Sequence, residues 1–285
     1  MMAEYVKLSR PKSWLKNIIV FIPLVFALEL FNINQLLATA IVFISFCLVS
    51  SAVYVFNDIC DAKLDATHEV KRNRPIASGA ITKRHAAVFA VLLCIFGLAA
   101  SFYVSLFACI LVIAYIILNI FYSLWLKNVL IFDCFCIAAG FVLRVYTGGA
   151  ASGEPVSDWL FLTIVSMALF MAFGKRRGEL VKGGDAEGRA VLRLYDKDFL
   201  QGMVWICAGL AVVFYSLWAI NRGNNMIYTV PLIIFIVSKY LLHVSDSNYY
   251  GDPTTIIFED KILLVVLGVY GLLTIALLYF GGLSK

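Results

Sequence analysis

The sequence predicts an all-helical, polytopic membrane protein with about nine transmembrane helices. Hydrophobic residues make up 62% of the 285-residue chain and charged residues 14%, and the mean hydropathy is +0.91. Soluble domains are about half apolar and a quarter charged, so a soluble globule is excluded, as are disordered, collagen-like and coiled-coil chains. The apolar residues form long continuous runs instead of alternating ten-residue strands, which excludes a transmembrane β-barrel.

Nine apolar runs are the candidate spans, because a helix needs roughly 20 apolar residues to cross the hydrocarbon core. The first run is short and contains Pro23 and Glu29, so we expect it to be kinked or to begin earlier, near Trp14. The predicted spans are 18–31, 35–56, 85–104, 106–123, 130–148, 157–174, 200–220, 226–243 and 260–281.

The basic residues predict the orientation of these spans. Nineteen of the 23 lysines and arginines fall on the side of the N-terminus, mostly in its tail and in two polar loops, 57–84 and 175–199. Only Arg222 and Lys285 fall on the opposite side. Positive loops stay in the cytoplasm, so we expect a multi-pass protein of the cell (inner) membrane with its N-terminus and both loops cytoplasmic. Neither loop is long enough to be a soluble domain, and we expect one transmembrane domain over 1–285.

An acidic motif follows the second span. Asn57 precedes Asp58, Asp61 and Asp65, which are spaced i, i+3 and i+7. On a helix these three carboxylates lie within roughly 60° of one another and repel unless a cation lies between them. Carboxylate and amide oxygens suit Mg²⁺, which completes its coordination with water and substrate phosphates. The alternative is a solvated helix end that only terminates the span.

A basic cluster lies a few residues further on. Lys71, Arg72 and Arg74 are followed by Pro75 and Gly79, which predict a structured turn. Arg74 can bind a phosphate through two parallel hydrogen bonds, and Lys71 and Arg72 are not distinguished as ligands. Acidic metal ligands and basic phosphate ligands within 20 residues together predict a site for Mg²⁺ and a diphosphate.

Further candidates for substrate binding lie elsewhere in the chain. Lys175 and Arg176 follow the sixth span and can face the same cytosolic side, and Tyr195 is as well explained by loop packing as by a bond to substrate. The remaining candidates are Lys16 before the first span, Tyr122 at the end of the fourth and Arg144 inside the fifth. A charge at membrane depth normally faces a polar cavity or a partner, whereas Lys16 can instead extend toward lipid headgroups.

The acidic motif resembles the first aspartate-rich motif of the UbiA superfamily of intramembrane prenyltransferases. The resemblance covers nearly the whole chain and implies a central cavity that opens to the cytosolic face. It is strongest to the branch that moves phosphoribose from phosphoribosyl diphosphate onto a polyprenyl phosphate of the decaprenyl type. The other matching motifs are Arg10-Pro11-x-x-Trp14-x-Lys16-Asn17, His68-x-x-Lys71-Arg72-x-Arg74-Pro75-Ile76-Ala77-Ser78-Gly79, Gly140-Phe141-x-x-Arg144 before Gly148-Gly149, and Gly174-Lys175-Arg176-x-x-Glu179.

Two departures from the family pattern bear on the reaction. Glu69 follows His68, where that branch often has proline, and His68 is given no role. Aromatic prenyltransferases carry a second Asp-x-x-x-Asp motif after span six, and no acidic pair in this loop has that spacing. The missing motif favours phosphoribosyl transfer over prenyl transfer. The acidic residues of that loop are Asp185, Glu187, Asp196 and Asp198.

We therefore expect an enzyme in which Asp58, Asp61 and Asp65 are catalytic and hold Mg²⁺ together with Asn57. Its partners are phosphoribosyl diphosphate, a polyprenyl phosphate and the bilayer, with no nucleic acid, and a homo-oligomer is left open. The first alternative is transfer of a prenyl group from its diphosphate to an aromatic or lipid acceptor. The second is a secondary transporter that uses Arg144 and Asp133 as coupling residues, although no internal repeat is found.

Overall fold

The computed structural model describes residues 2–67, 70–181, 190–223, 225–245 and 259–281. Every regular element in this part of the chain is a helix, as the sequence predicts. The helices fall into two compact units, the first over Met1–Pro155 and the second mainly over the rest of the chain.

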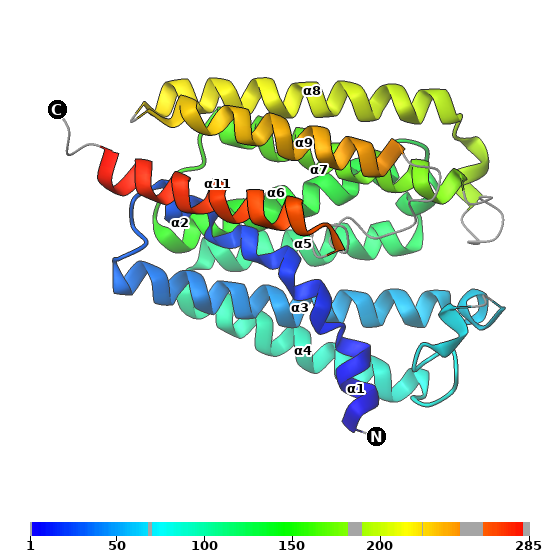
Figure 1. Ribbon diagram of the computed structural model, residues 1–285. Helices are drawn as coiled ribbons and strands as arrows, with labels where there is room; N and C mark the ends of the chain where they lie inside the picture. The colour runs from blue at the N-terminus through cyan, green and yellow to red at the C-terminus, as the bar shows by residue number, and fades with distance from the viewer. Residues whose placement is uncertain (1, 68–69, 182–189, 224, 246–258, 282–285) are drawn as a thin grey trace. The chain divides into compact units, whose positions relative to one another are not determined.

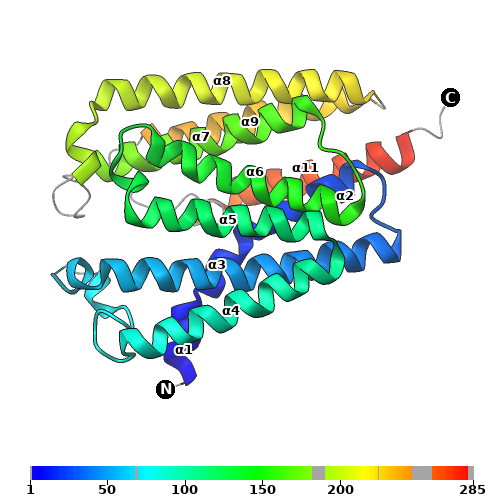
Figure 2. The same ribbon diagram turned by 180° about the vertical axis from the view of Figure 1, so that it is seen from behind.

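The first unit contains the α-helices α1 to α6. In it α3 runs beside α4 (Figure 1), and α5 beside α6 (Figure 2). One of its core clusters includes Val42, Phe46, Val112 and Tyr115, all buried. The elements are α1 (Met2–Ser9), η1 (Pro11–Phe21), α2 (Ile22–Phe26), α3 (Ile33–Thr67), η2 (Lys71–Asn73), α4 (Lys83–Val104), α5 (Leu106–Leu124), η3 (Leu126–Asn128) and α6 (Phe132–Ser152), where η marks a 3-10 helix.

The second unit contains α7 to α11. In it α7 packs along α8, with Trp159 stacked on Phe214 at 6.4 Å between ring centroids, and α9 contacts α11. Asp260 caps α11 by accepting from the backbone N–H groups of Ile262 and Leu263. The elements are α7 (Asp158–Val181), η4 (Ala190–Leu194), α8 (Lys197–Arg222), η5 (Met226–Thr229), α9 (Val230–Ser245) and α11 (Lys261–Phe280).

Eight helices among the described residues are long and apolar enough to cross a membrane, and they correspond to the second to ninth predicted spans. The first predicted span differs, because η1 and α2 divide it and η1 begins at Pro11. The 11 residues of η1 at about 2.0 Å each and the five of α2 at about 1.5 Å reach about 30 Å, the thickness of the hydrocarbon core. The earlier start is thus present, and the change from 3-10 to α geometry falls next to Pro23.

Two helices extend further than the sequence predicts. The 35 residues of α3 run through the acidic motif to Thr67, and at about 1.5 Å per residue this length exceeds any hydrocarbon core. Similarly, α7 continues to Val181, so Lys175 and Arg176 are helical and the expectation that the second loop begins at 175 is wrong. Hydropathy marks where a span leaves the lipid, whereas the backbone hydrogen bonds continue past that point.

Candidate functional site

The three aspartates of the acidic motif lie on the last turns of α3, in the helical phase that their spacing predicts. Asp58 is only 2% exposed and Asp65 only 4% exposed, whereas Asp61 is half-buried. Burying a carboxylate costs free energy unless a cation or hydrogen-bond donors compensate it. The surroundings of Asp58 and Asp65 therefore have to supply positive charge.

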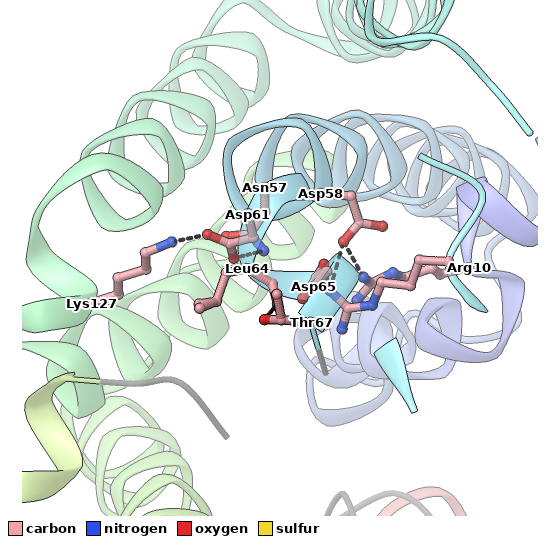
Figure 3. Close-up of polar contacts among 9 residues, drawn as sticks. Arg10, Asn57, Asp58, Asp61, Leu64, Asp65, Thr67 and Lys127 are labelled. Atoms are coloured by element: carbon pink, nitrogen blue, oxygen red, sulfur yellow. Dashed lines mark hydrogen bonds and ion pairs between the residues drawn. The ribbon is translucent and has the colours of Figure 1, made fainter. Parts of the chain in front are cut away.

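Two arginines supply that charge. Nη1 of Arg74 lies 3.0 Å from Oδ1 of Asp58 and 2.6 Å from Oδ2 of Asp65. Nη2 of Arg10 lies 2.5 Å from the same Oδ1 of Asp58. Figure 3 shows Arg10 reaching Asp58 from the N-terminal segment, next to Asp65. Two carboxylates two turns apart on one helix thus converge on a single guanidinium nitrogen.

Asp61 faces a different cation. Nζ of Lys127, on η3, lies 2.6 Å from Oδ1 of Asp61, and Nδ2 of Asn57 donates to Oδ2 at 3.0 Å. In Figure 3 Lys127 approaches from the side opposite to Arg10. The repulsion that the spacing predicts is therefore relieved by three basic side chains, two from loops and one from the N-terminal segment.

Arg10 is held by the local backbone. Its φ of 50° is left-handed, which is uncommon for a residue other than glycine, and it separates α1 from the 3-10 helix that Pro11 begins. The guanidinium also lies over the ring of Tyr54, 5.2 Å from its centroid, and Lys7 donates to the carbonyl of Asn73 at 2.8 Å. The N-terminal segment is thereby attached to both α3 and the basic loop.

The basic loop is the structured turn that Pro75 and Gly79 predict. Arg74 is extended, as expected before a proline, the carbonyl of Pro75 accepts from the N–H of Ile81 at 2.9 Å, and Gly79 has a φ of +78°. Ile76 and Ile81 are buried in a small apolar cluster with Leu8, Val55 and Ala62. This cluster fixes the loop beside α3 and so presents Arg74 to the aspartates.

Lys127 lies in the short connection between α5 and α6. The connection ends at Ile131, whose φ of 70° is a strained value for a β-branched residue. Such strain persists only where the surrounding structure imposes it. The connection is therefore held in one conformation, with Lys127 directed at Asp61.

The donor chemistry of this cluster suits Mg²⁺, because three carboxylates and one amide offer hard oxygen ligands. Within the described residues no three His, Cys, Asp or Glu side chains form a ready-made metal cage. Asp58 and Asp65 nevertheless converge on one cationic nitrogen of Arg74, which occupies the position of a small cation between them. The oxygen donors of the motif therefore fit a metal whose coordination is completed by water and phosphate oxygens.

The other predicted ligands of the first unit lie at different depths. Lys16 is half-buried on η1, Tyr122 is half-buried at the end of α5, Lys71 is half-buried on η2 and Arg72 is exposed there. Arg144 is buried on α6, and its hydrogen-bond acceptors are the side chains of Asn17 and Tyr115 and the carbonyl of Gly140, not an aspartate of the motif.

Three predicted ligands belong to the second unit. Arg176 is 1% exposed on α7 and pairs with Glu179 at 2.7 Å, Lys175 is half-buried beside it, and Tyr195 is buried and stacked on Phe199. The expectation that Arg176 begins a loop is wrong, because α7 continues through it. The motif residues His68, Glu69, Asp185 and Glu187 lie outside the described residues.

A second polar cluster joins α9 and α11. Asp260 accepts from Nε2 of His243 at 2.7 Å and lies 3.1 Å from Nζ of Lys239. The hydrogen bond from His243, followed by the bond from the N–H of Leu263, holds the pKa of Asp260 below its ordinary value. The contacts of Asp260 with His243 and Lys239 connect the start of α11 to α9.

Sequence reasoning missed Arg10 and Lys127 as site residues. Lys127 entered only as a cytoplasmic positive charge, and Arg10 only as part of a motif. The available signal for Lys127 was its isolation in a short loop between two spans. Its partner Asp61 lies 66 residues away, a distance that no local pattern bridges.

Comparisons with known proteins agree with the resemblance. Residues 18–249 match the model of the UbiA prenyltransferase family. Decaprenyl-phosphate phosphoribosyltransferases from Mycolicibacterium smegmatis and Corynebacterium glutamicum are 30% and 33% identical, each over 92% of this chain and over 88% and 82% of their own length. A UbiA homolog from Archaeoglobus fulgidus, solved with DMAPP and Mg²⁺, has a TM-score of 0.76 at 17% identity and covers 99% of this chain and 100% of its own.

Proposed function

This transferase belongs to the UbiA prenyltransferase family, and we propose that it moves 5-phosphoribose from phosphoribosyl diphosphate to a polyprenyl phosphate of the decaprenyl type, with Mg²⁺ as cofactor. The observation that carries the proposal is the convergence of Asp58 and Asp65 on Arg74, with Arg10 on the same carboxylate. Alternating carboxylates and guanidinium groups match the alternating charges of a metal–diphosphate complex.

The specific reaction is supported by the relatives and by the acidic pattern. Two relatives are 30% and 33% identical to this chain over 92% of its length, and both are named as phosphoribosyltransferases. The second Asp-x-x-x-Asp motif, which a prenyl-diphosphate enzyme would use to hold metal from the other side, is missing from the loop after α7. Transfer of a prenyl group therefore remains the alternative that the experiment below has to distinguish.

The chain's own residues bind the reacting groups and hold them in place. Asp58, Asp61, Asp65 and Asn57 would hold Mg²⁺, which neutralises the charge of the departing diphosphate when bound. Arg10, Arg74 and Lys127 would then exchange carboxylate oxygens for phosphate oxygens and align the donor. The other proposed ligands of the phosphates and the ribose in the first unit are Lys16, Lys71, Arg72 and Tyr122.

The reaction needs no general base. An oxygen of the lipid phosphate is already ionised at neutral pH and forms the new bond to the anomeric carbon, while the bond from that carbon to diphosphate breaks. Both charged products leave without a proton transfer at the site. We place the site at the cytoplasmic face, where the sugar donor is available and where the positive loops are expected to lie.

The decisive experiment offers purified protein two substrate pairs in the presence of Mg²⁺. One is radiolabelled phosphoribosyl diphosphate with decaprenyl phosphate, and the other is radiolabelled prenyl diphosphate with an aromatic acid. We expect labelled lipid from the first pair and none from the second. Product from the second pair alone would replace the proposal with prenyl transfer.

The matched variants are Asp58→Asn and Asp158→Asn. Asp158 is an exposed carboxylate in the first turn of α7, outside the proposed site. We expect turnover to be lost in the first variant and kept in the second. Removal of divalent cations with EDTA should abolish product, and added Mg²⁺ should restore it.

A further inference from the structure

Arg144 is enclosed by the protein within the first unit, whereas a side chain that binds substrate is open to it. It is 5% exposed, and each of its three guanidinium nitrogens has an acceptor within the protein. Nε donates to Oδ1 of Asn17 at 2.7 Å, Nη1 to the carbonyl of Gly140 at 2.8 Å and Nη2 to the hydroxyl of Tyr115 at 2.8 Å. These contacts use three of the five N–H donors of the guanidinium group, one on each nitrogen.

Aromatic rings cover the remaining surface of the Arg144 guanidinium. Its central carbon lies 4.6 Å from the ring centroid of Tyr115 and 5.6 Å from those of Phe46 and Phe141. Ring faces stabilise a cation electrostatically and exclude water. With an acceptor in the protein at each nitrogen, aromatic rings against its faces and only 5% exposure, the guanidinium group is bound by the protein and not presented to a phosphate.

Asn17 connects this cation to η1 and α3. Its Oδ1 accepts from Arg144, and its Nδ2 donates to Oγ of Ser50 at 3.2 Å and to Sγ of Cys47 at 3.5 Å. Asn17 is itself fully buried. A single side chain of the 3-10 helix is therefore bonded to α3 on one side and to α6 on the other.

Two more contacts fix η1 along its length. A Cβ added to Gly148 would lie 1.9 Å from the carbonyl oxygen of Val20, so the α6 and η1 backbones touch there. Nearer the N-terminus, Trp14 donates to Oγ of Ser51 at 2.9 Å, and that oxygen lies 2.7 Å from the carbonyl oxygen of Ser9. The last contact is one residue from Arg10.

The aspartate site lies further along the same helix. From Ser50 to Asp58 along α3 is eight residues, about 12 Å at 1.5 Å per residue. Arg144 therefore acts at a distance from the aspartates, whereas Arg10 at the start of η1 contacts Asp58 directly. Because Arg10 directly precedes η1, the position of its side chain depends on the placement of η1.

We propose that Arg144 is a positioning residue, which holds η1 through Asn17 and thereby places Arg10 on Asp58. This replaces the direct contact with substrate that the sequence predicts for Arg144. The proposal rests on the proposed function only in taking the aspartate cluster as the reacting site. It deepens that function by giving Arg144, a charge inside a span, the role of positioning a residue of the site.

A double-mutant cycle tests the relay. Arg144→Met and Arg10→Met should each raise the KM for phosphoribosyl diphosphate by about 10- to 100-fold, the size of one lost hydrogen bond to a charged group. If Arg144 acts through Arg10, the double variant should be no worse than the worse single variant. Losses that multiply would show an independent contact with substrate and overturn the proposal.

Hydrogen exchange tests the attachment without reference to the reaction. In Arg144→Met, we expect the backbone amides of 12–21 to exchange at least several-fold faster, with those of α4 unchanged. The control Arg177→Met removes a buried arginine from the second unit and should leave 12–21 as in the unmodified protein. Unchanged exchange over 12–21 in Arg144→Met would overturn the proposal even if phosphoribosyl transfer is confirmed.

Milder variants keep the test valid if Arg144→Met unfolds. Asn17→Ala leaves the cation in its aromatic cage and should reproduce both the faster exchange and the higher KM. Tyr115→Phe removes one acceptor but keeps the ring, and should have a smaller effect of the same kind. If the unmodified protein transfers no phosphoribose, binding of inorganic diphosphate in the presence of Mg²⁺ replaces KM in the cycle, so failure of the function and failure of the relay remain distinguishable.

Discussion

At the scale of single residues, the site is defined by how differently three similar carboxylates are placed. Asp58 and Asp65 are buried and share Arg74, whereas Asp61 is half-buried and faces Lys127. The spacing predicts one acidic face, and the structure divides that face between two groups of cations. The consequence is that equivalent substitutions should have equal effects on turnover and unequal effects on stability.

We expect Asp58→Asn and Asp61→Asn each to lower kcat by about 100-fold or more, because each removes the negative charge of a proposed metal ligand. Asp58→Asn should also lower the free energy of unfolding by about 1–3 kcal/mol, a range discounted because Arg10 and Arg74 are partly exposed. Asp61→Asn should cost less than about 1 kcal/mol. Activity assays and thermal unfolding in detergent measure the two effects, and near-normal turnover in either variant would contradict the metal assignment.

Lys127→Met should change metal and phosphate binding in opposite directions. Removing the ammonium group frees Asp61, so Mn²⁺ alone should bind about twofold to fivefold more tightly. Diphosphate at a fixed free Mn²⁺ concentration should bind about tenfold more weakly, because a charged donor is lost. Calorimetry measures both affinities, with Lys12→Met, an exposed lysine of η1, as the control. A parallel change of the two affinities would contradict the exchange of partners.

At the scale of elements, the 3-10 helix η1 is the part that the hydropathy pattern describes least well. Its 11 residues lengthen a span that would otherwise be too short, and its side chains connect α3 with α6. The fit depends on Gly148, where the two backbones approach too closely for any other residue. A steric change at this contact should therefore affect the aspartate site.

Gly148→Ala should destabilise the protein by about 1–3 kcal/mol, because the added methyl group would overlap the carbonyl oxygen of Val20. The matched variant is Gly209→Ala on α8, where nothing lies within 4 Å of the added Cβ. There we expect no loss, or a gain of up to about 1 kcal/mol from the higher helix propensity of alanine. Thermal unfolding of the two variants side by side measures the difference, and equal midpoints would contradict the close approach.

At the scale of the whole molecule, the predicted topology places most basic residues on one side of the membrane. Nineteen of the 23 basic residues are assigned to one side of the membrane, the side that also carries the acidic motif. The apolar surface, in contrast, faces the lipid. Only 11% of the most apolar stretch of α4 is buried inside the protein, against 56% for α3, as expected for a helix that faces lipid. The chain is a multi-pass membrane protein of the UbiA family.

The orientation is tested with single added cysteines and a membrane-impermeant maleimide. Lys12→Cys should be labelled only after the cells are opened, because its segment is expected in the cytoplasm. Asn221→Cys, an exposed position at the C-terminal end of α8, should be labelled in intact cells. The unmodified protein gives the background from its own seven cysteines. The reverse pattern would invert the topology and move the aspartate site to the outer face.

The sequence by itself determined the helical class, most of the spans and the shared face of Asp58, Asp61 and Asp65, because hydropathy and the 3.6-residue period are local properties. The turn at Pro75 and Gly79 could be predicted for the same reason. Only the tertiary structure decided which cations meet these carboxylates and that Arg144 bonds to Asn17. Those partners are 48, 66 and 127 residues apart, and packing of several helices brings them together. Whether a charge inside a span faces a substrate or the protein is settled by its neighbours in space, which no local pattern specifies.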